Sequence, residues 1–217
     1  MISVLTKDQA YKLDKDTIER GHLSQAELMD NAGKAVAQFF CEKIKDPFNK
    51  KVVVVCGKGN NGGDGVITHS YLLKYNVSSK IIFTEDKHSH SNVIKKYKIS
   101  KNDYSIYNDK EKFDKYDWII DGIFGIGLSR DLNDKYKKII HKLNKNRNII
   151  SIDIASGLFA DNAYSTYFIN PKYVSRRTLS IILLTSTEGD FLNHHPLEKA
   201  GPKNHGSVII LVSLCKI

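Results

Sequence analysis

Cysteine and proline are scarce in this chain, and their scarcity excludes several classes of protein. Three cysteines and four prolines occur among the 217 residues. Cys41, Cys56 and Cys215 lie far apart and form no C-x-x-C pair, which argues against a disulfide framework and against a structural zinc site. We therefore expect the protein to work in a reducing compartment.

Long apolar runs are also missing. No segment approaches the roughly 18 consecutive apolar residues that a membrane-spanning helix needs. The N-terminus, MISVLTKDQAYKLDKD, has no apolar core of signal-peptide length and mixes acids with its bases. We therefore expect neither a membrane anchor nor a secretory or transit peptide, and we predict a cytoplasmic protein.

What is present is the composition of one globular domain. Apolar residues make up 41% of the chain and charged residues 26%, with no internal repeat or low-complexity linker. We predict a single domain over residues 1–217. The net charge of +9 comes mainly from lysines spread along the chain. Such a spread is more typical of a solvated surface than of a nucleic-acid interface, so nucleic acid is not expected as a partner.

Helical patterns open the chain. Capping-box patterns predict helices that begin after Thr6 and Ser24, because side chain and backbone there satisfy each other's hydrogen bonds. The second helix carries an apolar stripe, and Gly33 within it predicts a close packing contact. Farther along, one helical face gathers apolar residues while lysines occupy the other faces: Leu132, Tyr136, Ile139, Ile140 and Leu143.

From Lys51 onward, short β-branched runs alternate with helical segments. Most runs are apolar without alternation, which is typical of strands buried inside a parallel sheet. We predict an α/β fold, a three-layer αβα Rossmann-like sandwich with a mostly parallel sheet, which binds ligands beyond the carboxyl ends of its strands. The predicted strands are Val52–Cys56, Ile81–Thr84, Trp118–Asp121, Ile149–Asp153, Leu179–Leu184 and Val208–Val212, with a weaker candidate at Ser105–Tyr107.

The first predicted strand runs into a glycine-rich loop, Gly57-Lys-Gly-Asn-Asn-Gly-Gly-Asp-Gly65, and a helix is expected from about Gly65. Glycines let a ligand approach the main chain, and a helix N-terminus can bind phosphate. The loop has neither a Walker ending nor the G-x-G-x-x-G register. It predicts phosphate or nucleotide binding through the backbone, Asn60 and Asn61. The alternative is a tight strand-to-helix turn.

Two more predicted strands end in polar loops. Asp121 ends an apolar strand, where a buried carboxylate would need water or a cation. Its loop offers Ser129 and Arg130 to a phosphate, although an ordinary loop with an exposed arginine is the alternative. The third loop carries Asp153 and Ser156. Parallel strands bring these loops to one edge, and their oxygen groups suit a hard cation better than zinc or copper.

Four segments together resemble the YjeF N-terminal domain family, the NAD(P)HX epimerases. The resemblance is strong over about residues 3 to 160 and weak beyond. It implies an enzyme that interconverts the R and S epimers of hydrated NADH and NADPH, acts beside an NAD(P)HX dehydratase and forms a homodimer. A chain of this length resembles the epimerase alone. The segments are Glu27-Leu-Met-Asp-Asn-Ala-Gly33, Gly57–Gly65, Asp121-x-x-Phe-Gly-x-Gly-Leu-Ser129 and Asp153-Ile-x-Ser-Gly157.

The resemblance also implies roles for individual residues. Asp153 would be the catalytic group that takes and returns a proton at the substrate hydroxyl. Asn61, Asp121 and Ser156 would bind a potassium ion. Contacts to the dinucleotide would come from Asn60, Asn61, Gly62, Gly63, Asp64, Gly125, Ile126, Gly127, Leu128, Ser129, Arg130, Asp131 and Asp153.

A non-catalytic scaffold or an RNA- or protein-binding module is the competing hypothesis, because domains of this fold also serve those roles. The chain departs from the family pattern at Ala155, where the family has proline, at Phe159, and at Thr185–Asp190, which lacks the family's lysine. Retention of polar groups at three strand ends favours the enzyme.

Three further features are predicted to be structural. The histidines of His88-Ser-His90 and His194-His195 have no acid or cysteine partners in sequence, so both pairs are predicted to lie on the surface. Cys56 is predicted to be an inert core thiol.

Overall fold

The computed structural model describes residues 6–160, 165, 167–176 and 209–212. Several predicted features lie outside these residues: the strand at Leu179–Leu184, the segment Thr185–Asp190, the pair His194-His195 and Cys215.

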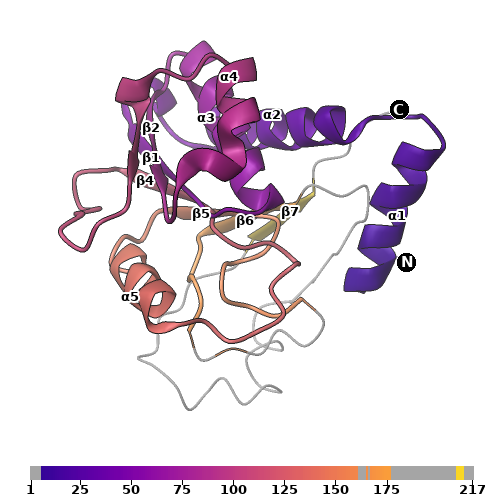
Figure 1. The fold of residues 1–217 in the computed structure, drawn as a ribbon. Helices are drawn as coiled ribbons and strands as arrows, with labels where there is room; N and C mark the ends of the chain where they lie inside the picture. Colours follow the sequence, from indigo (N-terminus) through magenta and orange to yellow (C-terminus); the bar gives the residue numbers. More distant parts are fainter. Residues whose placement is uncertain (1–5, 161–164, 166, 177–208, 213–217) are drawn as a thin grey trace.

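A parallel β-sheet forms the centre of the molecule, as predicted (Figure 1). The strand order is β3-β2-β1-β4-β5-β6-β7, and every neighbouring pair is parallel. The first six strands in this order match a Rossmann sheet. The strands are β1 (Lys51–Cys56), β2 (Ser78–Phe83), β3 (Tyr104–Ile106), β4 (Trp118–Gly122), β5 (Ile149–Ile152), β6 (Tyr173–Arg176) and β7 (Ile209–Val212).

Helices cover both faces of the sheet, which confirms the three-layer prediction. Figure 1 shows α2, α3 and α4 on one face and α5 on the other, while α1 lies apart, beyond the end of α2. The α-helices are α1 (Lys7–Glu19), α2 (Gln25–Lys43), α3 (Asn60–Lys74), α4 (Ser91–Lys96) and α5 (Asp134–Leu143). Short 3-10 turns are η1 (Pro47–Asn49), η2 (Lys87–His90) and η3 (Lys101–Asp103).

The predicted capping boxes and apolar faces are confirmed. Thr6 and Ser24 each accept a hydrogen bond from the backbone three residues on, and the side chain at that position bonds back. On α5, Tyr136 and three aliphatic side chains are buried against the sheet.

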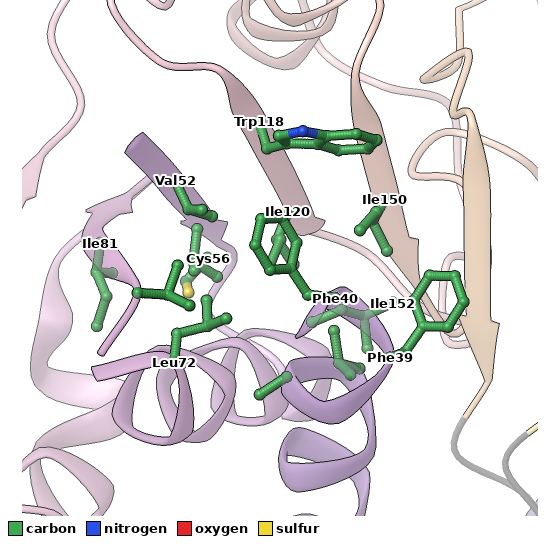
Figure 2. Close-up of a cluster of buried hydrophobic side chains, with 14 of the residues drawn as sticks. Phe39, Phe40, Val52, Cys56, Leu72, Ile81, Trp118, Ile120, Ile150 and Ile152 are labelled. Carbon is green, nitrogen blue, oxygen red and sulfur yellow. The ribbon is translucent and has the colours of Figure 1, made fainter. Parts of the chain in front are cut away.

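The larger core fills the space between the sheet and helices α2 and α3. Figure 2 shows Phe39 and Phe40 of α2 and Leu72 of α3 pointing toward the strands. Phe40 meets Trp118 edge-on, with ring centroids 5.9 Å apart. Cys56 is fully buried in this core, and burial raises the pKa of its thiol, as expected for an inert cysteine.

Gly33 makes the close contact that the sequence predicted. A Cβ at this position would lie 2.6 Å from the Cβ of Ile67 on α3, so only glycine lets the two helices approach this closely. This contact holds α3, and therefore the start of α3 at the sheet edge, in a fixed place.

Strand β6 was not predicted. It covers Tyr173–Arg176, and its first three residues pair with Ile150 to Ile152 of β5. Val174 is its only aliphatic residue, so the segment lacks the apolar run that indicated the other strands. Within the described chain, no helix combines the length and the apolarity needed to cross a bilayer.

Candidate active site

The predicted site residues lie where the strand order of the sheet reverses, between β1 and β4. Strands β1 and β4 are neighbours, and the chain leaves β1 for α3 on one face and β4 for the side of α5 on the other. The Gly57 amide donates to the carbonyl oxygen of Gly122 at 3.0 Å, which joins the two strand ends. Open α/β sheets bind their ligands at such a switch point.

Helix α3 begins at Asn60, so the prediction of a start near Gly65 was wrong. Asn60 to Asp64 therefore form its first turn instead of a loop. The early start depends on glycine, because a Cβ at Gly62 would lie 1.9 Å from the Gly57 carbonyl oxygen and one at Gly57 would lie 2.0 Å from that of Ile123. These two glycines serve the tight strand-to-helix turn.

The N-terminus of α3 is uncapped and open to solvent. Gly59 is its N-cap residue, has no side chain to cap the helix, and has no atom within 4 Å of its Cβ position. Asn60 beside it is exposed. Uncapped N–H groups and the helix dipole favour an anion at such a position, so this end of α3 can receive a phosphate.

Asn61 is buried next to this turn and is unsatisfied. It is 7% exposed, and neither its Oδ1 nor its Nδ2 has a hydrogen-bond partner among the described residues. A buried amide without partners is costly, and native structures contain few of them. Asn61 therefore points to a ligand that accepts or donates a hydrogen bond, or that coordinates an amide oxygen.

Asp121 is fully buried and fully engaged. Its Oδ1 accepts from the Ile123 amide at 3.2 Å and from Ser156 Oγ at 2.6 Å, and its Oδ2 accepts from Ser151 Oγ at 2.8 Å and the Ser156 amide at 3.0 Å. Burial raises the pKa of this carboxyl, and these hydrogen bonds offset part of the rise. Among the described residues, two hydroxyls and two backbone amides therefore stabilise the buried Asp121 carboxylate.

Ser156 joins the loops after β4 and β5. Its Oγ accepts from the Phe124 amide at 2.8 Å and lies 3.2 Å from the Phe124 carbonyl oxygen. Together with its bonds to Asp121, this contact fixes the loop that begins at Ile123 against the loop that begins at Asp153.

Asp153 has an unusual backbone. Strand β5 ends at Ile152, one residue earlier than predicted, and Asp153 has a φ of 68°, which is rare for a residue with a side chain. The Ile154 amide donates to the Ile152 carbonyl at 2.8 Å, so the chain reverses around Asp153. Backbone strain of this kind is concentrated at functional sites.

The carboxylate of Asp153 is held over the middle of the β4 loop. Its Oδ2 accepts from the Ile126 amide at 2.7 Å. A Cβ at Gly125 would lie 2.5 Å from this oxygen and 3.4 Å from the Cγ of Asn61. Asp153 and Asn61 therefore both lie beside Gly125, whose missing side chain leaves room for them. A fixed carboxylate beside an unsatisfied amide can exchange a proton with a bound hydroxyl.

Some of the remaining predicted residues lie beside Asp153, and others lie away from it. Gly125 and Ile126 meet Asp153, whereas Ser129, Arg130 and Asp131 are exposed farther along the loop. Gly63 lies beneath the sulfur of Met29, and Asp64 is buried in the first turn of α3. The predicted loops therefore converge at Asn61 and Asp153, and the segment Ser129–Asp131 forms an exposed rim.

His90 corrects the prediction of a surface histidine pair. His88 is exposed and pairs with Asp86, but His90 is buried, with Nε2 2.7 Å from the Gly57 carbonyl oxygen and its ring stacked on Phe83 at 5.8 Å. Burial lowers the pKa of His90, although the hydrogen bond opposes this shift. His90 therefore stabilises the glycine turn through its hydrogen bond with the Gly57 carbonyl.

Sequence reasoning missed Ser151 and the backbone of Phe124. Ser151 is the only polar residue of β5 and lies directly opposite Asp121 in the register of β4 and β5. A lone hydroxyl in one apolar strand and a lone carboxylate in its neighbour could have indicated the pair. Nothing in the sequence indicates the amide of Phe124, because backbone contacts depend on the loop conformation.

Comparison with known proteins identifies the family of this chain. The family model for the YjeF-related protein N-terminus matches residues 25–185, about three quarters of the chain. The chain belongs to the YjeF N-terminal family. The yeast protein ynu0 (YNL200c) has the same fold, with a TM-score of 0.69 at 23% identity over 80% of this chain and 79% of its own.

Several relatives of this YjeF N-terminal chain have named activities. The NAD(P)H-hydrate epimerase of Entamoeba histolytica is 32% identical over 163 residues, which cover 74% of this chain and 72% of that protein. The epimerase of Oenococcus oeni is 34% identical, covering 73% and 76%. The bifunctional NAD(P)H-hydrate repair enzyme Nnr of Dictyoglomus turgidum is also 34% identical, but this chain spans only 32% of its length.

Proposed function

We propose that this YjeF N-terminal chain is an NAD(P)H-hydrate epimerase, an isomerase that interconverts the R and S epimers of hydrated NADH and NADPH. The observation that carries the proposal is the Asp153 carboxylate, held at the switch point by the Ile126 amide beside the unsatisfied Asn61. The relatives in Entamoeba and Oenococcus that bear this name support it.

The chemistry of the substrate calls for such a group. The hydrated ring carries a hydroxyl at C6 next to the ring nitrogen, so inversion can proceed through loss and return of that hydroxyl or through ring opening and closure. Loss of the hydroxyl needs an acid that donates a proton to the leaving oxygen and takes one back from the returning water. Ring opening needs a base that takes the proton from that oxygen and returns it on closure, so both routes need a group that exchanges a proton at this oxygen. Asp153 would do this, because its second oxygen is fixed by the Ile126 amide.

Binding of the dinucleotide is assigned to the two loops beside Asp153. The open N-terminus of α3 would receive phosphate oxygens through the amides of Asn60 and Asn61, because those of Gly62 and Gly63 donate to the Gly59 carbonyl oxygen. The loop from Gly125 to Asp131 would cover the other side, with the exposed guanidinium of Arg130 available to an anion.

The residues also fit a potassium ion. The described chain has no cluster of three or more His, Cys, Asp or Glu side chains, so a metal here would depend on amide, hydroxyl and carboxylate oxygens. Asn61 Oδ1 is a buried oxygen without a partner, and Asp121 and Ser156 supply charge and a hydroxyl nearby. Such oxygens suit a hard cation. The ion would offset the buried charge of Asp121 and steady the loops.

The proposal extends to the location, oligomeric state and functional partner of the enzyme. We infer a cytoplasmic homodimer whose functional partner is an NAD(P)HX dehydratase. The bifunctional relative in Dictyoglomus, named as a repair enzyme, supports the link to repair of these nucleotides.

Chromatographic or NMR measurement of R- and S-NADPHX interconversion tests the proposal. We expect the protein to accelerate interconversion above the spontaneous rate, and Asp153→Asn to lower kcat by about 100-fold or more, the usual contribution of general acid–base catalysis. Asp114→Asn, an exposed acid away from the site, is the matched control. No acceleration by the wild type would overturn the epimerase, and RNA binding with a steep salt dependence would favour the scaffold instead.

A further inference from the structure

Helix α1 reaches the proposed site through one side chain. None of its described residues is buried, yet the hydroxyl of Tyr11 lies 3.0 Å from the position that a Cβ on Gly127 would occupy. Gly127 follows Ile126, whose amide holds the Asp153 carboxylate. Tyr11 therefore stands over the part of the β4 loop that positions Asp153.

The surroundings of Tyr11 keep its hydroxyl protonated. Partial burial raises its pKa above the usual 10.0, and the negative charges of Asp153 and Asp14 raise it further. The influence of Asp153 means that the phenol and the proposed catalytic carboxylate share one electrostatic environment. At neutral pH the phenol is thus a hydrogen-bond donor.

A purely structural role does not account for this placement. Tyr11 is 45% exposed, so its ring contributes little to a core. Its helix buries no residue whose packing would require the hydroxyl at Gly127. Glycine at position 127 leaves the space in which a hydroxyl and a ligand can meet.

We propose that Tyr11 is a further substrate-contacting residue, and that its hydroxyl donates a hydrogen bond to an oxygen of the hydrated nicotinamide bound between α1 and the Gly125–Gly127 turn. The proposal rests on the epimerase function above. It makes α1 one wall of the site and gives the enzyme a hydrogen-bond donor beside Gly127, two residues from the glycine that Asp153 and Asn61 approach.

Steady-state kinetics with Tyr11→Phe test this role, because the variant removes only the hydroxyl. We expect KM for NADPHX to rise about fivefold, the effect of one lost hydrogen bond, and kcat to change less than about twofold. Tyr75→Phe, at the far end of α3, is the matched control and should leave both constants unchanged. Wild-type KM in Tyr11→Phe would overturn the proposal.

Calorimetry separates this proposal from the epimerase function. An equilibrated mixture of the two NADPHX epimers undergoes no net reaction, so its binding can be measured whether or not the protein turns it over. We expect Tyr11→Phe to weaken this binding about fivefold with an unchanged Tm. If the wild type shows no turnover, the epimerase function fails, and the binding difference alone then decides on Tyr11. Equal binding by wild type and variant would overturn the role of Tyr11 in either case.

Discussion

At the strand ends, three buried polar residues differ in how their hydrogen-bonding capacity is used. Asp121 accepts four hydrogen bonds, and Ser156 both donates and accepts, so both are committed to holding loops together. Asn61 uses neither of its amide atoms. A ligand therefore gains most by meeting Asn61, while Asp121 and Ser156 provide charge and shape around it.

Replacement of Asn61 tests the proposed potassium site. Asn61→Ala should raise the potassium concentration that gives half-maximal epimerase activity by about tenfold, because one hydrogen-bonding or coordinating group is lost. The Tm of the variant without potassium should stay near the wild-type value, since the amide makes no hydrogen bond to lose.

Thermal shift with and without potassium provides a measurement that does not depend on turnover. Potassium should raise the Tm of the wild type and of Asn92→Ala, an exposed control on α4, but not that of Asn61→Ala. An equal rise in all three proteins would place the ion elsewhere.

His69 predicts how stability depends on pH. It is fully buried on α3, its Nδ1 lies 3.0 Å from Ser79 Oγ, and burial lowers its pKa from 6.5 to about 4. Below pH 6.5 the unfolded chain binds a proton that the folded chain does not. The free energy of unfolding should therefore fall between pH 6.5 and pH 4, by up to ~3 kcal/mol from this group, and level off below.

Urea denaturation at several pH values measures this effect. His69→Gln removes the titrating group, so its stability should fall less than that of the wild type between pH 7 and pH 4. His141→Gln, an exposed histidine on α5, should follow the wild type. Parallel pH curves for His69→Gln and wild type would contradict the prediction.

The elements differ in how far the sequence determined them. Strands β1 and β4 were predicted to within one residue, because each is an apolar run that the sheet buries on both faces. Asn60 and Gly62 resemble loop residues by type, so the start of α3 was misplaced. Its true start depends on the close approach of Gly57 to Ile123, which lies 66 residues farther along the chain and cannot be seen in a local sequence pattern.

The candidate site was likewise predictable only in part. Convergence of Asn61 and Asp153 could be predicted, because parallel strands bring their ends to one edge. The left-handed backbone of Asp153 and the contact of Tyr11 with Gly127 could not, since both depend on how loops fold over one another.

The contact between α2 and α3 gives a prediction about the helices. Gly33→Ala should destabilise the protein by about 2 kcal/mol, although alanine favours a helix by roughly 1 kcal/mol, because the added methyl would overlap Ile67. Chemical denaturation measures the change. Lys34→Ala on the exposed side of α2 is the control and should have little effect. A Gly33→Ala variant that is more stable than the wild type would show that α2 and α3 can move apart without loss of stability.

Across the whole molecule, burial is unevenly distributed. Every residue of β4 is buried, as are all residues of β1 after the first, whereas α1 buries none of its described residues. The molecule therefore combines a tightly packed centre with one lightly attached helix, and that helix carries Tyr11.

Hydrogen exchange should reveal this difference. Amides of α1 should exchange at least about 100-fold faster than those of β1 and β4, because few buried contacts hold that helix. Helix α2, which packs one face on α3 and the sheet, provides the internal control. Protection of α1 equal to that of α2 would mean that a partner surface covers it in solution.

The glycine turn has a consequence for how relatives of this protein are classified. Gly57 and Gly62 bring three backbone segments into contact, and any side chain there would collide with a carbonyl oxygen. A homologue that had lost its activity would still need both glycines to fold. Matches to the glycine motif therefore report descent and architecture, whereas Asn61 and Asp153, which carry the proposed chemistry, are the positions at which working enzymes could be separated from inactive scaffolds.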